Sequence, residues 1–181
     1  SPANNMYQAF YGLKERPFAL LPDPSFLFLS NGHSTALTLL RYSIMSRQGF
    51  TVISGEVGGG KTTLINRLLD EMKTGVTVGL INFTTPSSGD MGEWIMMAYG
   101  LPYKGKGKVE LYDDFVQFMI REYAAGRPVV LIVDEAQNLG IRGLEEIRML
   151  SNVNAQKDYL LHVILVGQPE LRSLLQTPQL R

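Results

Sequence analysis

The chain has 181 residues, of which 45% are hydrophobic and 19% are charged, a composition typical of a globular domain. Its 17 basic residues balance 17 acidic ones, so no overall positive field points to nucleic acid or an anionic membrane surface. The absence of cysteine excludes a disulfide framework, a thiolate metal site and a cysteine nucleophile. The apolar runs are much shorter than the roughly 20 residues that a membrane span needs, so none is expected within this sequence.

Three segments are expected along the chain. Residues 1–5 are interpreted as a cloning remnant that precedes a natural start at Met6. Residues 6–49 are expected to form an N-terminal arm and a helix packed on the core. Residues 50–181 are expected to form the core itself, incomplete at its C-terminus because the sequence stops within a helical pattern.

In chain order, prolines up to residue 30 argue against a long helix, so this stretch is interpreted as irregular, and helical spacing follows over 37–44. Apolar segments then alternate with segments of helical periodicity. Strands are predicted at 50–54, 75–83, 128–137 and 159–168, and helices at 61–73, 90–100, 111–126, 143–152 and 169–176. Because each strand is apolar on both faces, the pattern predicts an α/β three-layer sandwich with a mostly parallel sheet.

The segment "GEVGGGKTT" lies between the first of these strands and the following helix. It matches the phosphate-binding pattern G-x-x-x-x-G-K-[ST] through Gly55, Gly60, Lys61 and Thr62. Glycines let such a loop curl with its N–H groups pointing inward, and the helix N-terminus adds a positive dipole, which favours a polyphosphate. Lys61 is expected to act at the β- and γ-phosphates and Thr62 to ligate Mg²⁺, whereas Thr63 is interpreted as an ordinary first-turn residue. The predicted nucleotide-binding residues are Gly55, Glu56, Val57, Gly58, Gly59, Gly60, Lys61, Thr62 and Thr63.

Two acids follow the apolar run "VVLIV", at the end of a strand where ligands of open α/β sheets bind. Asp134 is expected to hold Mg²⁺ together with Thr62, and Glu135 to orient the attacking water, so hydrolysis is favoured over phosphate transfer. Gln168 is expected to contact the γ-phosphate or that water. Asn82 is expected to hydrogen-bond Glu135 and hold it away from water until a partner binds. The alternative for Gln168 is a turn-capping amide, and the alternative for Asn82 is an ordinary strand-end amide.

Five stretches together resemble the AAA-type ATPases of the general secretion pathway A class. They are "MYQAFYGLKERPFALLPDPSFLFLS", "GEVGGGKTT", "VDEAQNL", "LEEIRMLSN" and "LVGQPELRSLL", and they extend over nearly the whole chain from Met6. These ATPases are similar to secretion ATPases of exosortase loci and, more distantly, to transposition helper ATPases.

The resemblance implies a P-loop NTPase fold of the AAA (ASCE) type, ending before a helical lid, that binds and hydrolyses ATP with Mg²⁺ as a homo-oligomer. It implies that the strand of Asp134 neighbours the phosphate-loop strand. It assigns the Mg²⁺ aspartate to Asp134, the catalytic glutamate to Glu135 and the sensor to Gln168. An arginine finger is expected near the end of the core, at Arg181 or a later residue, with Arg148 as a lower-ranked candidate beside its interpretation as a helix-surface charge. For four arm residues it leaves open an adenine pocket or simple packing: Phe10, Leu13, Pro17 and Phe18.

The expected function is an ATPase, in a bacterial cytoplasm or at the inner membrane periphery, that drives conformational change in a secretion or cell-envelope assembly with a protein partner. Two alternatives stay open: a DNA-associated transposition helper, with nucleic-acid binding not favoured, and a nucleotide-dependent scaffold with little turnover. Among smaller signals, Trp94 is expected in the core and His162 as a buried imidazole with satisfied hydrogen bonds. The lysines of 104–108 are expected on a solvated turn, with contact to a phosphate or a lipid as the alternative.

Overall fold

The structure is a computed structural model that describes residues 25–28, 33–56, 58, 60–72, 74–84 and 90–176. Several residues singled out in the sequence lie outside these ranges, namely Phe10, Leu13, Pro17, Phe18, Val57, Gly59 and Arg181. Among the described residues, no helix combines the length and the apolar character that a membrane crossing requires.

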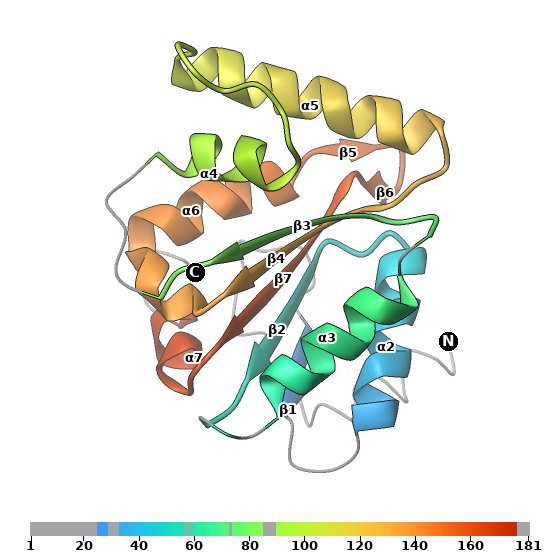
Figure 1. Ribbon diagram of the computed structural model, residues 1–181, viewed down its shortest axis with the longest axis vertical. Coiled ribbons are helices and arrows are strands. Elements are labelled where there is room, and N and C mark those ends of the chain that lie inside the picture. Colours follow the sequence, from blue (N-terminus) through green and yellow to red (C-terminus); the bar gives the residue numbers. More distant parts are fainter. Residues whose placement is uncertain are drawn as a thin grey trace.

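A parallel sheet of five strands forms the centre of the molecule, in the spatial order β1-β2-β7-β4-β3 (Figure 1). Its strands are β1 (Ser25–Phe28), β2 (Phe50–Ser54), β3 (Thr77–Asn82), β4 (Val129–Asp134) and β7 (Leu161–Gly167). Each pairs with its neighbour in parallel. A short antiparallel pair, β5 (Asn154–Ala155) with β6 (Asp158–Tyr159), precedes β7. The predicted parallel sheet is therefore confirmed.

Strand β1 corrects one expectation about the N-terminal stretch. Its residues belong to the segment interpreted as irregular, yet Ser25 to Phe28 pair in register with Thr51 to Ser54 of β2. The prolines of this stretch argue against a long helix, but the last of them comes before residue 25, so the strand itself contains none. The end of the stretch therefore forms an edge strand.

The strand order corrects the expectation that the Asp134 strand neighbours the phosphate-loop strand. Strand β7 lies between them, since Leu165 is in register with Val52 of β2 on one side and with Val133 of β4 on the other. All seven residues of β7 are buried, which suits the middle of a sheet. Strand β3, by contrast, lies at an edge, and Leu80 on it is 46% exposed. The expectation that every strand is covered on both faces is wrong for β3.

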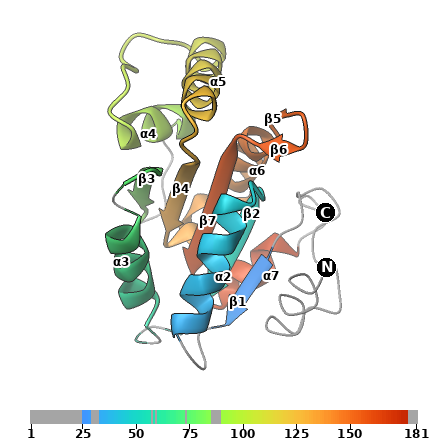
Figure 2. The same ribbon diagram turned by 90° about the vertical axis from the view of Figure 1, so that its right-hand side faces the viewer.

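Helices cover both faces of the sheet, which gives the three predicted layers (Figures 1 and 2). Helices α2 (His33–Met45) and α3 (Lys61–Glu71) pack on one face. On the other face lie α4 (Met91–Ala98), α5 (Lys108–Ala124), α6 (Gly140–Ser151) and α7 (Glu170–Leu175). The 3₁₀ turn η1 (Ala136–Leu139) follows β4 and leads into α6.

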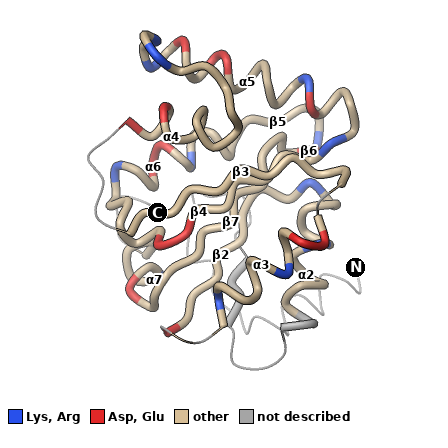
Figure 3. The backbone as a smooth tube through the Cα atoms, in the orientation of Figure 1, with Lys and Arg blue, Asp and Glu red and all other residues tan. Residues whose placement is uncertain are grey.

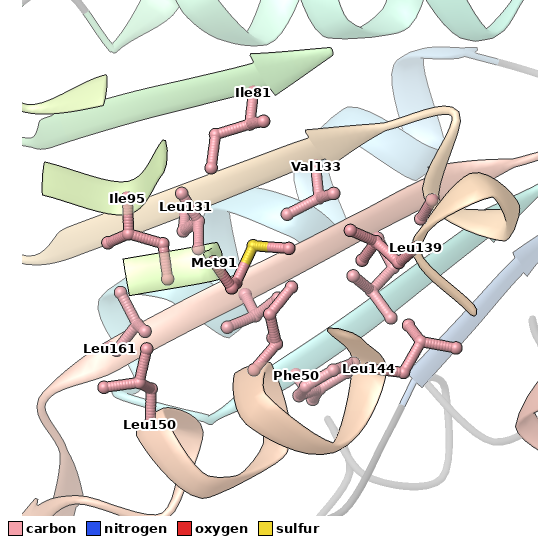
Figure 4. Close-up of a cluster of buried hydrophobic side chains, with 14 of the residues drawn as sticks. Phe50, Ile81, Met91, Ile95, Leu131, Val133, Leu139, Leu144, Leu150 and Leu161 are labelled. Atoms are coloured by element: carbon pink, nitrogen blue, oxygen red, sulfur yellow. The ribbon is translucent and has the colours of Figure 1, made fainter. Parts of the chain in front are cut away.

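The larger apolar core lies between the sheet and α4 to α7 (Figure 4). Phe50 and Leu131 reach it from the strands, and Ile95 and Leu144 reach it from the helices, each at most 3% exposed. Trp94 was expected there but is 39% exposed, because α4 lies at the β3 edge. Its ring packs edge-on against Phe83, with 5.8 Å between ring centroids.

A close contact between α4 and β3 depends on a glycine. A Cβ atom on Gly79 would lie 2.6 Å from Cζ of Tyr99, so only glycine leaves room for this ring. The Tyr99 hydroxyl in turn donates a hydrogen bond to the carbonyl oxygen of Val130 on the neighbouring strand. The residue at the C-cap of α4 is thereby fixed to β3 and β4 together.

His162 confirms the prediction of a buried, hydrogen-bonded imidazole. It is 3% exposed, its Nδ1 donates to the carbonyl oxygen of Gln48, and its Nε2 accepts from the Thr51 hydroxyl at 2.9 Å. Burial lowers the pKa of His162 to about 4, against a smaller opposite effect of the Gln48 hydrogen bond. The ring is therefore neutral at physiological pH.

Charged residues of both signs follow one another along α5 and the loop before it (Figure 3). Lys106 donates to Asp114 at 2.6 Å, and Lys108 lies 3.7 Å from Glu146 on α6. Two of the three lysines of 104–108 are therefore paired with carboxylates. Such pairing favours the interpretation as a turn over that of a phosphate contact.

Candidate functional site

Two described glycines of the loop between β2 and α3 have a backbone conformation that favours glycine. Gly58 and Gly60 have φ angles of 83° and 93°, in the left-handed region that other residues adopt at a cost. Gly60 is the N-cap of α3 and carries no side chain that could cap the helix. The first-turn N–H groups, from Lys61 onward, are therefore available to an anion, and the helix dipole favours one.

A cavity of about 260 Å³ lies over this loop and connects it with Glu135, the second residue of the acid pair. Its lining residues are Glu56, Gly58, Gly60, Lys61, Thr62, Thr63 and Glu135. The structure thus brings Glu135 to the phosphate loop from a different strand. Thr63, interpreted as an ordinary first-turn residue, also faces the cavity.

Lys61 begins α3 and extends back over the loop. Its Nζ donates to the carbonyl oxygen of Gly55, and to that of Glu56 at 3.2 Å. The ammonium group is therefore held at the cavity wall by backbone oxygens. A compact cation at this position suits the charge of a polyphosphate.

Asp134 ends β4 on the face of the sheet that α3 covers, because Ile132, two residues earlier, belongs to the core beneath α3. Its Oδ1 accepts from the N–H of Glu135 at 2.9 Å, and its Oδ2 accepts from Nδ2 of Asn82 at 3.3 Å. Partial burial raises the pKa of Asp134, and the charge of Glu135 adds to the rise, while the Glu135 N–H and Lys61 oppose it.

These residues fit a hydrated Mg²⁺ rather than a cation caged by protein. Burial is the largest cause of the raised pKa of Asp134, and a divalent cation would compensate this partly buried negative charge. Within the described part of the chain, no three His, Asp or Glu side chains gather into a metal cluster. Mg²⁺ typically takes one or two protein ligands and completes its shell with phosphate oxygens and water. Thr62 at the cavity wall and Asp134 match that demand.

The Glu135 carboxylate is held by a residue that the sequence analysis missed. Nε2 of Gln137 donates to Oε2 of Glu135, while Oε1 of Gln137 accepts from the backbone N–H of Gln168 at 3.2 Å. Asn82, expected to bond Glu135, bonds Asp134 instead, because the two residues are in register on paired strands. The signal available in the sequence was an amide residue two positions after the acid.

Turn η1 begins after Glu135 and is joined to the end of β3 by a hydrogen bond. Glu135, its N-cap, has a φ of 52°, a left-handed conformation that is uncommon for a residue with a side chain. Nδ2 of Asn138 donates to the carbonyl oxygen of Phe83 at 2.6 Å, beyond the end of β3. Gln168 follows β7 and lies half-buried between the ends of β2 and β4. The structure therefore places the four strand ends of the predicted site side by side.

Comparisons with known proteins agree with this architecture. The chain matches the AAA domain family over residues 44–175. It is 38% identical over 177 residues to general secretion pathway protein A of Aeromonas hydrophila. The matched region covers 97% of this chain and 32% of that protein. The chain thus spans about a third of the length of this curated relative. The resemblance to the general secretion pathway A class is confirmed.

Two solved structures of the Aeropyrum pernix ORC2 protein share the fold. The form with ADPNP–ADP complexes has a TM-score of 0.56 at 19% identity, over 80% of this chain and 42% of that one. The ADP form has a TM-score of 0.57 at 20% identity, over 81% and 44%. The predicted AAA-type P-loop NTPase fold is confirmed, and the chain belongs to the AAA domain family.

Proposed function

We propose that this chain binds ATP with Mg²⁺ and hydrolyses the bond between the β- and γ-phosphates. The observation that carries the proposal is the cavity that joins the left-handed glycine loop and Lys61 to Glu135. The N-terminal end of α3 and the ammonium group of Lys61 form one wall of the cavity. The carboxylate of Glu135, which can polarise water, forms the other wall. A site that only bound phosphate would have no need of the second wall.

In this proposal each residue keeps one task. The N–H groups of 58–62 bind the phosphate oxygens, and Lys61 stabilises the charge that develops on them during transfer. Thr62 and Asp134 hold Mg²⁺, which, when bound, neutralises charge on the phosphates. Glu135 accepts a proton from the attacking water and directs the water's oxygen toward the γ-phosphorus. Gln168 is in reach of the same region from the end of β7.

Binding is tested by titrating the chain with ATP, GTP and ADP in Mg²⁺ by calorimetry, beside Lys61→Ala. Saturable binding that prefers adenine and is lost in the variant is expected. Equal binding by parent and variant would remove the loop from the mechanism.

Turnover is tested by phosphate release from the parent and from Glu135→Gln, which keeps the shape of the side chain but cannot take a proton. The rate should fall by about 100-fold or more while ATP affinity persists. Equal rates would reject Glu135 as the base. If instead both proteins bind ATP but neither releases phosphate at a measurable rate, the nucleotide-dependent scaffold would be favoured.

We further propose that the chain works as a homo-oligomer in a bacterial secretion or cell-envelope assembly, on the cytoplasmic side of the membrane. The support is the 38% identity to general secretion pathway protein A, to about a third of whose length the chain corresponds. The DNA-associated alternative predicts salt-sensitive binding to duplex DNA. Absence of such binding at physiological salt, in a filter or anisotropy assay, would reject it.

A further inference from the structure

One peptide group at the end of β7 touches both halves of the site. The carbonyl oxygen of Gly167 accepts from the N–H of Gly55, the first residue of the phosphate loop, at 3.2 Å. The N–H of Gln168, in the same planar peptide unit, donates to Oε1 of Gln137 at 3.2 Å. Gln137 then donates through Nε2 to the carboxylate of Glu135. A continuous chain of hydrogen bonds therefore runs from the phosphate loop to the acid.

We propose that Gln137 is a positioning residue that couples the phosphate loop to Glu135 through the Gly167–Gln168 peptide group. The inference rests on the proposed hydrolysis and names the part of the chain that sets the direction of its base. A carboxylate has two oxygens, and Gln137 holds Oε2. The side chain thereby keeps one orientation while Glu135 lines the cavity.

The residues that surround Gln137 in the fold leave space for its side-chain amide. A Cβ atom on Gly167 would lie 2.5 Å from Oε1 of Gln137, so a residue with a side chain would displace the amide. The left-handed backbone of Glu135 turns the chain directly into η1, which brings a residue two positions later back beside the carboxylate. Asn138 holds the far side of the turn on Phe83. Each of these features fixes the amide between its two partners.

Coupling follows from the rigidity of the links. A peptide unit is planar and cannot tilt its C=O without tilting its N–H. A displacement of Gly55 on nucleotide binding would therefore be passed to the N–H from which Gln137 accepts. Hydrogen bonds in such chains also polarise one another, so loss of the central amide weakens both ends. The orientation of the Glu135 carboxylate thereby depends on the position of Gly55.

The test replaces Gln137 by Met, which fills similar space but can neither donate nor accept as the amide does. The matched control is Gln117→Met, the same replacement at an exposed position on α5. The Gln137→Met variant should lose about 10-fold or more in kcat, while its Kd for ATP stays within about twofold of the parent's. The control should change neither. Unchanged or higher kcat, or a parallel loss of ATP affinity, would overturn the inference.

A double variant separates positioning from general damage. If Gln137 acts only through Glu135, Glu135→Gln/Gln137→Met should retain the same residual rate as Glu135→Gln alone. Independent losses that multiply would mean that Gln137 acts elsewhere, and the inference would fail.

A second readout does not depend on turnover. In amide NMR spectra, Gln137→Met should shift the backbone signal of Gln168, and binding of Mg²⁺ and ADP should shift the side-chain amide signals of Gln137 in the parent. Lack of either shift would overturn the inference. A parent that binds ADP with both shifts present but never releases phosphate would reject the proposed hydrolysis while leaving the coupling in place.

Discussion

The buried imidazole of His162 predicts a specific loss of stability in mild acid. In the unfolded chain His162 takes up a proton near its ordinary pKa of 6.5, whereas in the folded protein the pKa is lowered to about 4. Between these values the unfolded state binds more protons, so the free energy of unfolding falls as the pH falls. The loss begins near pH 6.5 and is complete below pH 4.

The size of the loss follows from the two pKa values. Lowering the pKa of His162 from 6.5 to about 4 corresponds to about 3 kcal/mol in the free energy of unfolding, of which about 2 kcal/mol is lost by pH 5. The raised pKa of Asp134 acts in the opposite direction, because its folded form binds protons more readily as the acid range is approached. The effect of His162 is therefore best isolated as a difference between two proteins.

Urea unfolding of the parent and of His162→Asn at pH 7, 6 and 5 measures that difference. Asparagine offers an N–H toward Gln48 but is smaller than the imidazole, so the variant should be less stable at pH 7. Because asparagine has no titrating ring, the stability of the variant should change less with pH. The gap between the proteins should narrow by about 2 kcal/mol from pH 7 to pH 5. A constant gap would mean that His162 is not kept neutral, and would refute the argument.

Two further changes test other parts of the structure. Gly79→Ala places a methyl group 2.6 Å from the Tyr99 ring, so thermal unfolding should show a loss of about 1–3 kcal/mol, and an unchanged melting temperature would contradict the close contact. Asn82→Ala removes the donor to Asp134 and should weaken the affinity for Mg²⁺ with ATP without raising the hydrolysis rate. A rise in that rate would instead favour the restraining role first expected for Asn82.

Local patterns in the sequence predicted the parts of the fold and site that depend on neighbouring residues. The glycine loop, Lys61 and the first turn of α3 lie within one short stretch, so their geometry follows from φ preferences and the helix end. The pair Asp134 and Glu135 follows an apolar strand, and the ends of parallel strands meet at one edge. Those predictions needed no information on distant contacts.

Contacts between distant segments were harder to predict. Trp94 has the character of a core residue, and its exposure depends on the position of α4 at the sheet edge. The bond from Gln137 to Glu135 depends on a left-handed turn that no sequence pattern indicates. Asn82 was assigned to the wrong acid because its partner is set by the register of β3 on β4.

The position of β7 also bears on how the site could accommodate its ligands. Strands are spaced about 4.8 Å apart, so the ends of β2 and β4 are separated by about 10 Å with β7 between them. Adjacent strands would halve this separation and bring Asp134 closer to the phosphate loop. The intervening strand widens the space between the phosphate loop and Asp134, and its last peptide group links Gly55 through Gln137 to Glu135. The strand order that the resemblance did not anticipate therefore provides the peptide group on which the proposed coupling depends.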